Sequence, residues 1–110
     1  MSTGVAPVTL ARAAAAAATA SPDVVRLDGG LVGELATYGG GSRVVGVRAE
    51  VGPRPRLEVR AVVRSGRPLA EIGDDLRRRV ADRLEHRYPG LAPVVDIHIS
   101  DVEAAAEETG

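Results

Sequence analysis

A histidine and two aspartates near the C-terminal end of the chain are the residues best suited to metal or acid–base chemistry. His98 follows Asp96 by two residues and precedes Asp101 by three. Imidazole and carboxylate groups in such a cluster could bind a metal ion or transfer protons. On one extended strand, however, same-face neighbours such as Asp96 and His98 supply at most two ligands, and His86 lies in a separate segment. We therefore interpret His98 as a surface histidine and expect neither a metal ion nor a cofactor.

Two further motifs match catalytic or phosphate-binding sequences only in part. The run GGGSR at residues 39–43 is rich in glycine, as phosphate loops are, but no lysine follows it and it leads into a strand instead of a helix. Ser100 precedes Asp101 without a nucleophile elbow or a matched histidine. The glycine run is therefore predicted to be a flexible linker, and we expect a non-enzymatic protein without catalytic residues.

The densest basic patch is the run Arg77-Arg78-Arg79 together with Arg83. Such a patch could bind anionic lipid headgroups or RNA. Three aspartates lie about one helical turn away and offset part of this charge, namely Asp74, Asp75 and Asp82. A solvated helix face with salt bridges is therefore the favoured interpretation.

Two strands with strict apolar–polar alternation precede this basic segment. Segments 44–51 and 57–64 each place their apolar side chains on one face. These side chains are Val45, Val47, Ala49 and Val51 in the first segment and Leu57, Val59, Ala61 and Val63 in the second. Both prolines between the segments fall in residues 52–56, which are predicted to form a hairpin loop.

A long amphipathic helix is predicted from Pro68, as its first residue, to Arg87. Its apolar stripe, which should face the sheet, consists of Leu69, Ile72, Leu76, Val80 and Leu84. With a rise of ~1.5 Å per residue, this helix is about as long as a strand and brings the chain back to the end of the sheet at which strand 57–64 starts. Segment 94–102 is therefore predicted to form a third strand, parallel to 57–64 through a right-handed crossover. The pattern leaves open whether this strand lies beside the first or the second.

The two ends of the chain and residues 21–42 lack the regular apolar pattern of segment 43–102. Residues 1–7 are predicted to be a disordered N-terminus, followed by a helix that Thr9 caps and that continues to about Ala20. The glycine-rich residues 21–42 are predicted to be a flexible connector within the single domain 8–102. Residues 103–110 form an acidic tail.

These elements together predict a two-layer α+β domain. An N-terminal helix precedes a β-β-α-β unit with a three-stranded mixed sheet, and both helices cover one face. The other face should carry Arg48, Glu50, Glu58, Arg60, Val62, Arg64, Asp96 and His98. Two open sheet edges and this polar face suit association, although simple solvation of one face remains an equal alternative. The candidate interaction surface comprises Arg48, Arg60, Arg64, Arg77, Arg78, Arg79, Arg83 and His98.

Composition excludes several functional classes. The 110 residues include no Cys, Phe or Trp, so thiolate zinc sites and cysteine nucleophiles are excluded. With Tyr38 and Tyr88 as the only aromatic side chains, we do not expect recognition by base stacking. All 14 basic residues are Arg. Segment 43–102 contains twelve of them and nine acidic residues, and this excess of positive charge is too small to indicate nucleic-acid binding. Because no apolar run approaches the ~20 residues of a membrane span, we expect no direct span.

The order of these motifs resembles a known family. The sequence reads VxVxAxV, a turn, LxVxAVV, then SGRPLAEI, LxxxVxxxL and finally PVVDIHISDV. This pattern is similar to the alkaline shock protein family of envelope stress-response proteins, also called Gls-type general stress proteins. The resemblance covers residues 8–102 and is most specific from Val44 to Val102. Arginine in place of the family's usual lysine indicates a high-GC, actinobacterial branch.

The resemblance implies a non-enzymatic cytoplasmic protein that acts beside the membrane in cell-envelope homeostasis. It implies self-association into a homo-oligomer and a membrane-anchored partner protein, and it supplies no catalytic or cofactor residues. The alternative hypothesis is a small RNA- or ribosome-associated module that uses the arginine-rich helix, which rests on analogy of fold alone.

Overall fold

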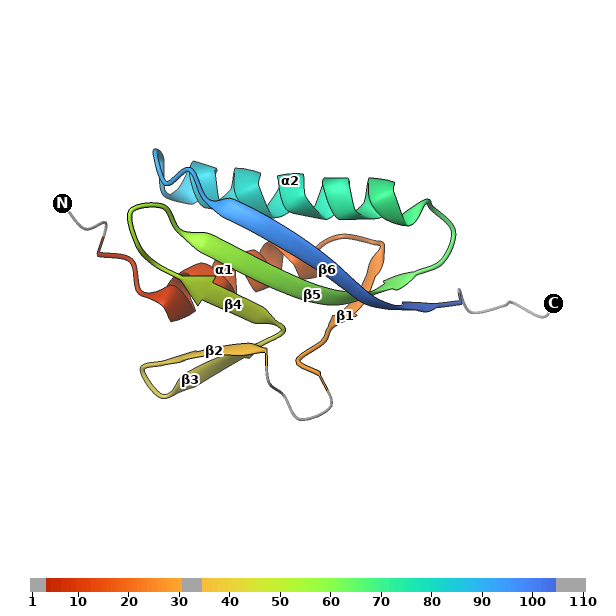
Figure 1. Cartoon of the computed structure of the whole chain (residues 1–110), viewed down its shortest axis with the longest axis horizontal. Coiled ribbons are helices and arrows are strands. Elements are labelled where there is room, and N and C mark those ends of the chain that lie inside the picture. The colour runs from red at the N-terminus through yellow and green to blue at the C-terminus, as the bar shows by residue number, and fades with distance from the viewer. Residues whose placement is uncertain (1–3, 31–34, 105–110) are drawn as a thin grey trace.

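The central element is strand β5 (Arg56–Arg64), which pairs along both of its edges (Figure 1). Strand β6 (Val94–Glu103) runs parallel to it along one edge. Strands β4 (Val47–Glu50) and β1 (Val24–Leu27) share the other edge and are antiparallel to β5. The computed structural model describes residues 4–30 and 35–104. The predicted parallel third strand is confirmed, and it lies beside the second predicted strand.

Two helices, α1 (Pro7–Thr19) and α2 (Leu69–Arg87), cover one face of this sheet, behind it in the view of Figure 1. They bury the apolar side of the alternating strands, which removes this surface from water. The fully buried side chains at the centre include Leu10, Leu57, Val59, Ile72, Leu76, Val80 and Leu84. The α+β class and the placement of both helices on one face are therefore confirmed.

The first residue of the predicted α2 stripe differs from the rest. The other four members are completely buried, whereas the Leu69 side chain is 46% exposed. Leu69 begins the helix, and Pro68 precedes it as the N-cap residue, so Pro68 is not the first helical residue as predicted. The prediction that Leu69 is buried is wrong, because this residue lines a surface hollow together with Val95 and Ile97 of β6.

Helix α1 begins two residues before the predicted capping residue. Pro7 is its first residue, and Ala6 is the N-cap without a side-chain hydrogen bond, so the prediction that Thr9 caps the helix is wrong. The fixed φ of proline suits the first helical position. Val5 also packs against the core, so the packed structure starts before residue 8. The remaining part of the expected disordered end, residues 1–3, lies outside the described residues.

The segment predicted as a connector contains ordered strands. It holds β1 and most of a hairpin made by β2 (Ala36–Gly39) and β3 (Ser42–Val45), while residues 31–34 lie outside the described residues. Gly40 and Gly41 have φ values of +55° and +78°. Two consecutive positive φ angles suit a tight two-residue hairpin turn, which glycine forms without strain. The described sheet therefore has four strands instead of three, with this hairpin beside it.

The predicted strand 44–51 is divided at Gly46, where φ is +85°. Val45 pairs with Ala36 in the hairpin, whereas Val47 pairs with Val59 in the main sheet. The chain thus changes sheets at one residue, and the single continuous strand is a wrong prediction. Val51 lies beyond β4 and is 53% exposed, so it does not belong to the core face.

The polar sheet face also differs from prediction at Val62. This residue is only 2% exposed because β1 and β6 flank it, with Arg26 and Asp101 as its register partners. Glu103, assigned to the tail, is the last residue of β6 and forms an ion pair with Arg26 (2.6 Å). Residues 105–110 of the predicted tail lie outside the described residues.

Candidate interaction surfaces

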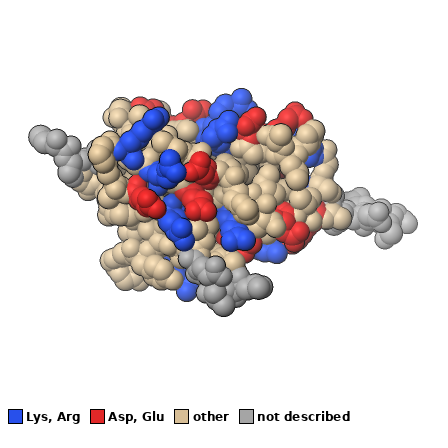
Figure 2. Space-filling model, in the orientation of Figure 1, with Lys and Arg blue, Asp and Glu red and all other residues tan. Residues whose placement is uncertain are grey.

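The sheet face opposite the helices carries interleaved charges of both signs. Figure 2 views this face and shows arginines and acidic residues side by side. Arg48 lies 3.8 Å from Glu58, and Arg56 lies 3.8 Å from Asp96. These side chains are 40–61% exposed, so each pair contributes only ~0–1 kcal/mol. Arg48, a predicted interaction residue, is thus on the surface but has an acidic neighbour.

A polar cluster on the same face joins two segments that are far apart in the sequence. The Ser100 hydroxyl donates a 2.7 Å hydrogen bond to Asp28, whose other carboxylate oxygen accepts one from the Gly30 N–H. These bonds, that of Ser100 foremost, lower the pKa of Asp28. The Nε atom of Arg60 is buried without a hydrogen-bond partner among the described residues, and it lies 3.8 Å from Asp28. The lowered pKa makes the Asp28 carboxylate a weaker general base toward the Ser100 hydroxyl.

His98 lies next to this cluster and is exposed. It is the register partner of Arg60 across the β5–β6 pair. Among residues 4–30 and 35–104 there is no group of three or more His, Cys, Asp or Glu side chains that could hold a metal ion. The sequence interpretation placed His98 and Arg60 on this face correctly, but it missed Asp28, whose contact with Ser100 depends on the path of β1.

Arg64 has a structural role. Its guanidinium donates hydrogen bonds to the carbonyl oxygens of Pro22 (3.2 Å) and Val24 (2.9 Å). These bonds fasten the start of β1 to the end of β5. Arg64, a predicted interaction residue, is thus exposed but already engaged within the fold.

The run Arg77-Arg78-Arg79 is held by two aspartates of α2. Arg77 pairs with Asp74 (2.8 Å), while Arg78 and Arg79 both pair with Asp75 (3.6 and 3.2 Å). The hydrogen bond from Arg79 is the main reason that the pKa of Asp75 is lowered. The salt-bridged helix face is the interpretation that these contacts support.

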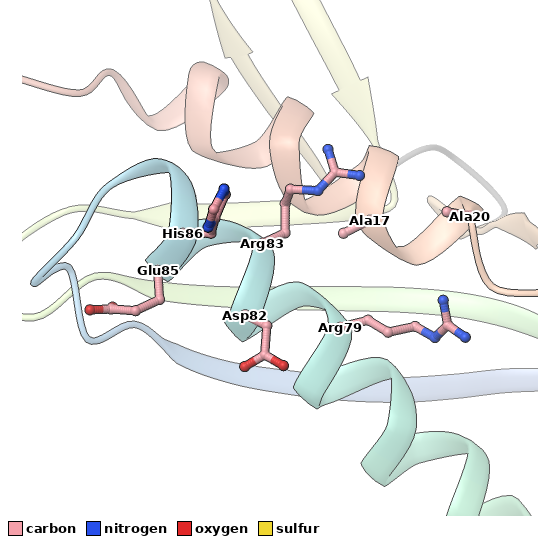
Figure 3. Close-up of a pocket in the computed structure, with 7 residues that line it drawn as sticks. All are labelled: Ala17, Ala20, Arg79, Asp82, Arg83, Glu85 and His86. Carbon is pink, nitrogen blue, oxygen red and sulfur yellow. The ribbon is translucent and has the colours of Figure 1, made fainter.

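A groove of about 710 Å³ lies between α1 and α2 (Figure 3). Ala17 and Ala20 line it from α1, and α2 contributes Arg79, Asp82, Arg83, Glu85 and His86. In Figure 3 the Arg83 guanidinium reaches toward α1 and the His86 ring lies on the same side, whereas the carboxylates of Asp82 and Glu85 point away from α1. The small alanine side chains leave this space open, so the basic groups face a solvent-filled groove.

A second hollow of about 250 Å³ continues this groove on the other side of Arg83. It adds Arg12 from α1 and Arg87 from α2. Arg87 lies over the Tyr88 ring, 5.9 Å from its centroid. Within the described part of the chain, Arg12, Arg83 and Arg87 form no ion pair with an acidic residue. The sequence interpretation included Arg83 but missed Arg12 and Arg87, because only the packing of α1 on α2 brings them together.

The Glu85 carboxylate is hydrogen-bonded to the loop that follows α2. It accepts hydrogen bonds from the N–H groups of Gly90 (2.7 Å) and Ala92 (2.9 Å). These bonds, led by that of Ala92, lower the pKa of Glu85. The groove therefore keeps a basic character although two acidic residues are part of its lining.

Comparison with family models, with curated proteins and with solved structures finds no match to the chain. None of the helices in the described ranges is long and apolar enough to cross a membrane.

Proposed function

We propose that this protein is a non-enzymatic adaptor of the alkaline shock type, which acts in cell-envelope homeostasis through protein–protein contacts. It works in the cytoplasm at the inner face of the cell membrane, where it binds a membrane-anchored partner protein and further copies of itself. The resemblance of the motifs in residues 44–102 supports the biological role.

The observation that carries the binding role is the groove between α1 and α2. Arg83 lines this groove, and Arg12 and Arg87 line the hollow that continues it, all three without acidic partners among the described residues. The carboxylates of Asp82 and Glu85 point away from α1. Arginine is suited to paired hydrogen bonds with carboxylates. An acidic, helical segment of a partner protein fits this combination of a small-residue floor and basic walls.

The ion pairs on α2 argue against the run Arg77-Arg78-Arg79 as an RNA site. Arg77, Arg78 and Arg79 each have an aspartate within 3.6 Å. A phosphate would have to compete with carboxylates that are already in place. The groove around Arg83 is the surface where the basic groups lack such competition.

Fluorescence anisotropy with a labelled amphipathic peptide that carries glutamates on one face tests this proposal. We expect binding to the wild type and a loss of affinity of at least about tenfold, ~1.4 kcal/mol, for Arg83→Glu. The matched control is Arg78→Glu, which makes the same charge change on α2 outside the groove and should bind like the wild type. Equal weakening by both variants would show that net charge alone is responsible and would contradict a groove site.

A labelled single-stranded RNA measured in parallel tests the alternative. Binding to phosphates weakens steeply between about 50 and about 200 mM salt because counterions are released. RNA binding that is stronger than peptide binding and depends on Arg77–Arg79 would overturn the adaptor proposal.

A gene deletion complemented with either variant tests the role in cells. We expect the deletion to increase sensitivity to cell-wall antibiotics and alkaline shift, and Arg78→Glu to restore resistance while Arg83→Glu does not. Unchanged resistance of the deletion strain would contradict a function in envelope stress.

A further inference from the structure

The outer edge of β6 is a short and well-defined site for strand pairing. Val94 donates its N–H to the Pro55 carbonyl (2.8 Å), and the parallel register with β5 is regular from Val94 to Ile99. Since backbone groups of successive strand residues alternate in direction, Val95, Ile97 and Ile99 direct theirs away from β5. Within residues 4–30 and 35–104, no strand pairs with this edge.

A proline marks one end of this edge, and a register shift marks the other. Pro93 precedes it and has no N–H to donate. After Ile99 the register with β5 shifts by one residue, because Ala61 pairs with Ile99 but Val62 pairs with Asp101. The regular edge is therefore limited to the outward groups of Val95, Ile97 and Ile99.

A hollow of about 460 Å³ lies beside this edge, between β6 and the first half of α2. Its apolar lining is Leu69, Ala70, Val95, Ile97 and Ile99, and the charged residues Asp74, Arg77 and Asp96 line it as well. Leu69 is 46% exposed, and Ile97 and Ile99 are only half-buried. An added strand would cover these side chains and satisfy the outward backbone groups in one step.

Gly73 is an independent sign that something approaches α2 here. Gly73 lines the same hollow and lies within α2, away from both helix ends. A helical glycine lowers a folding equilibrium constant about fivefold relative to alanine. A Cβ atom at Gly73 would meet nothing within 4 Å, so the described fold has no packing reason for glycine here. Close approach of another backbone is one structural reason for such a glycine.

We propose that β6 of a second copy of this chain occupies the site, antiparallel to the first, with Ile97 on the two-fold axis. This inference deepens the proposed adaptor function, on whose self-association it rests. In this register Ile97 faces Ile97 of the second copy, and Val95 faces Ile99, so every outward backbone group is paired. The apolar side chains of both copies meet on the helix side of the joined sheet, in the hollow beside Gly73.

Hydrogen-bond complementarity of the opposed side chains selects this register, because a ring N–H of histidine can donate to a carboxylate. It places Asp96 opposite His98 of the second copy, twice, on the polar face, where both residues are exposed. A two-fold axis at His98 would place the two histidines together and would reach past the register shift. An axis at Asp96 would place two carboxylates opposite each other, which is unfavourable. The register centred on Ile97 avoids both problems.

Disulfide cross-linking tests the register directly because the chain has no native cysteine. Opposed residues of a pair without backbone hydrogen bonds are close enough for a disulfide. On mild oxidation we expect D96C/H98C to form a covalent dimer, whereas D96C and H98C alone do not. A covalent dimer of H98C alone or D96C alone would indicate a shifted register and would overturn the proposal, as would the absence of any cross-link.

Gly73 provides a second test that does not depend on cysteine chemistry. Light scattering with size-exclusion chromatography should show a concentration-dependent dimer for the wild type. We expect Gly73→Leu to raise the dimer dissociation constant at least tenfold and to remain folded, since leucine favours a helix. Arg78→Leu is the matched control, because it adds the same side chain to α2 away from the hollow. A wild type that stays monomeric at all concentrations, or equal effects of both variants, would overturn the proposal.

The two proposals fail in different assays. Gly73→Leu should keep its affinity for the acidic peptide, and Arg83→Glu should still form the dimer. A normal dimer in Arg83→Glu together with absent peptide binding by every variant would refute the groove site and leave the strand-edge dimer supported.

Discussion

The hydroxyl of Thr37 on β2 donates a 2.6 Å hydrogen bond to the carbonyl oxygen of Val47 on β4. The hydroxyl oxygen of Thr37 in turn accepts a 3.0 Å hydrogen bond from the Ala49 N–H. One buried side chain thus takes the place of a neighbouring strand at the outer edge of β4. This contact covers part of the outer edge of β4, whereas no strand among residues 4–30 and 35–104 pairs with the outer edge of β6.

The substitution Thr37→Val tests this contact. Valine keeps the shape of threonine but leaves the Val47 carbonyl and the Ala49 N–H without their buried partner, so we expect a loss of ~1–3 kcal/mol in the free energy of unfolding. Thr37→Ser is the matched control, because it keeps the hydroxyl and removes only a methyl group. Urea denaturation measures both, and a larger loss for serine than for valine would contradict the role of the hydrogen bonds.

Gly46 sets the change of sheet between β3 and β4. An added Cβ atom would lie 2.7 Å from the Leu27 Cβ and 3.0 Å from the Asp28 nitrogen, and φ is +85°. Gly46→Ala should therefore cost more than the ~1–2 kcal/mol of a left-handed conformation alone. Gly40→Ala is the control, since its φ is also positive but nothing lies within 4 Å. Equal losses in urea denaturation would show that the contact with β1 is unimportant.

Alternation and helical periodicity predicted the central part of this fold. Residues 57–64, 69–87 and 94–102 formed the expected strand, helix and parallel strand because each buries one regular face. Gly46 could not be predicted from the same signal, because Val45 and Val47 keep the alternation in phase on both sides of it. A positive φ changes the direction of the chain without changing the pattern.

The candidate surfaces were predictable only where they lie on one element. The aspartate pairs of Arg77–Arg79 follow from helical spacing. Arg12 and Arg83 meet through helix packing, and Asp28 meets Ser100 across 72 positions of the sequence. No local pattern encodes such contacts, since the four-residue strand β1 was hidden in a glycine-rich segment.

Glu85 should contribute to stability against acid. Its pKa is lowered in the folded protein by the N–H groups of Ala92 and Gly90. The contribution is therefore complete above its ordinary pKa and is lost as the pH falls from about 4.5 through the lowered folded value. Glu85→Gln should lower the melting temperature at pH 7, and the difference from the wild type should shrink below pH 4.5.

Asp82→Asn is the matched control for this experiment. Asp82 lies on the same exposed side of α2, and its side chain makes no hydrogen bond to the described residues. Thermal unfolding followed by circular dichroism at several pH values should show little change for this variant. A difference between Glu85→Gln and the wild type that grows toward low pH would contradict the loop contact.

Leu84 and Leu69 belong to one sequence stripe but have opposite environments. Leu84 is completely buried, so Leu84→Ala should cost ~2–5 kcal/mol of unfolding free energy through lost transfer energy and a cavity. Leu69 is 46% exposed at the hollow beside β6, so Leu69→Ala should cost less than ~1 kcal/mol in the monomer. The same Leu69 variant should weaken the dimer in light scattering, because its side chain would be covered there. Urea denaturation at a concentration below the dimer dissociation constant separates the two effects, and a large loss for Leu69→Ala under that condition would mean that this residue serves the core after all.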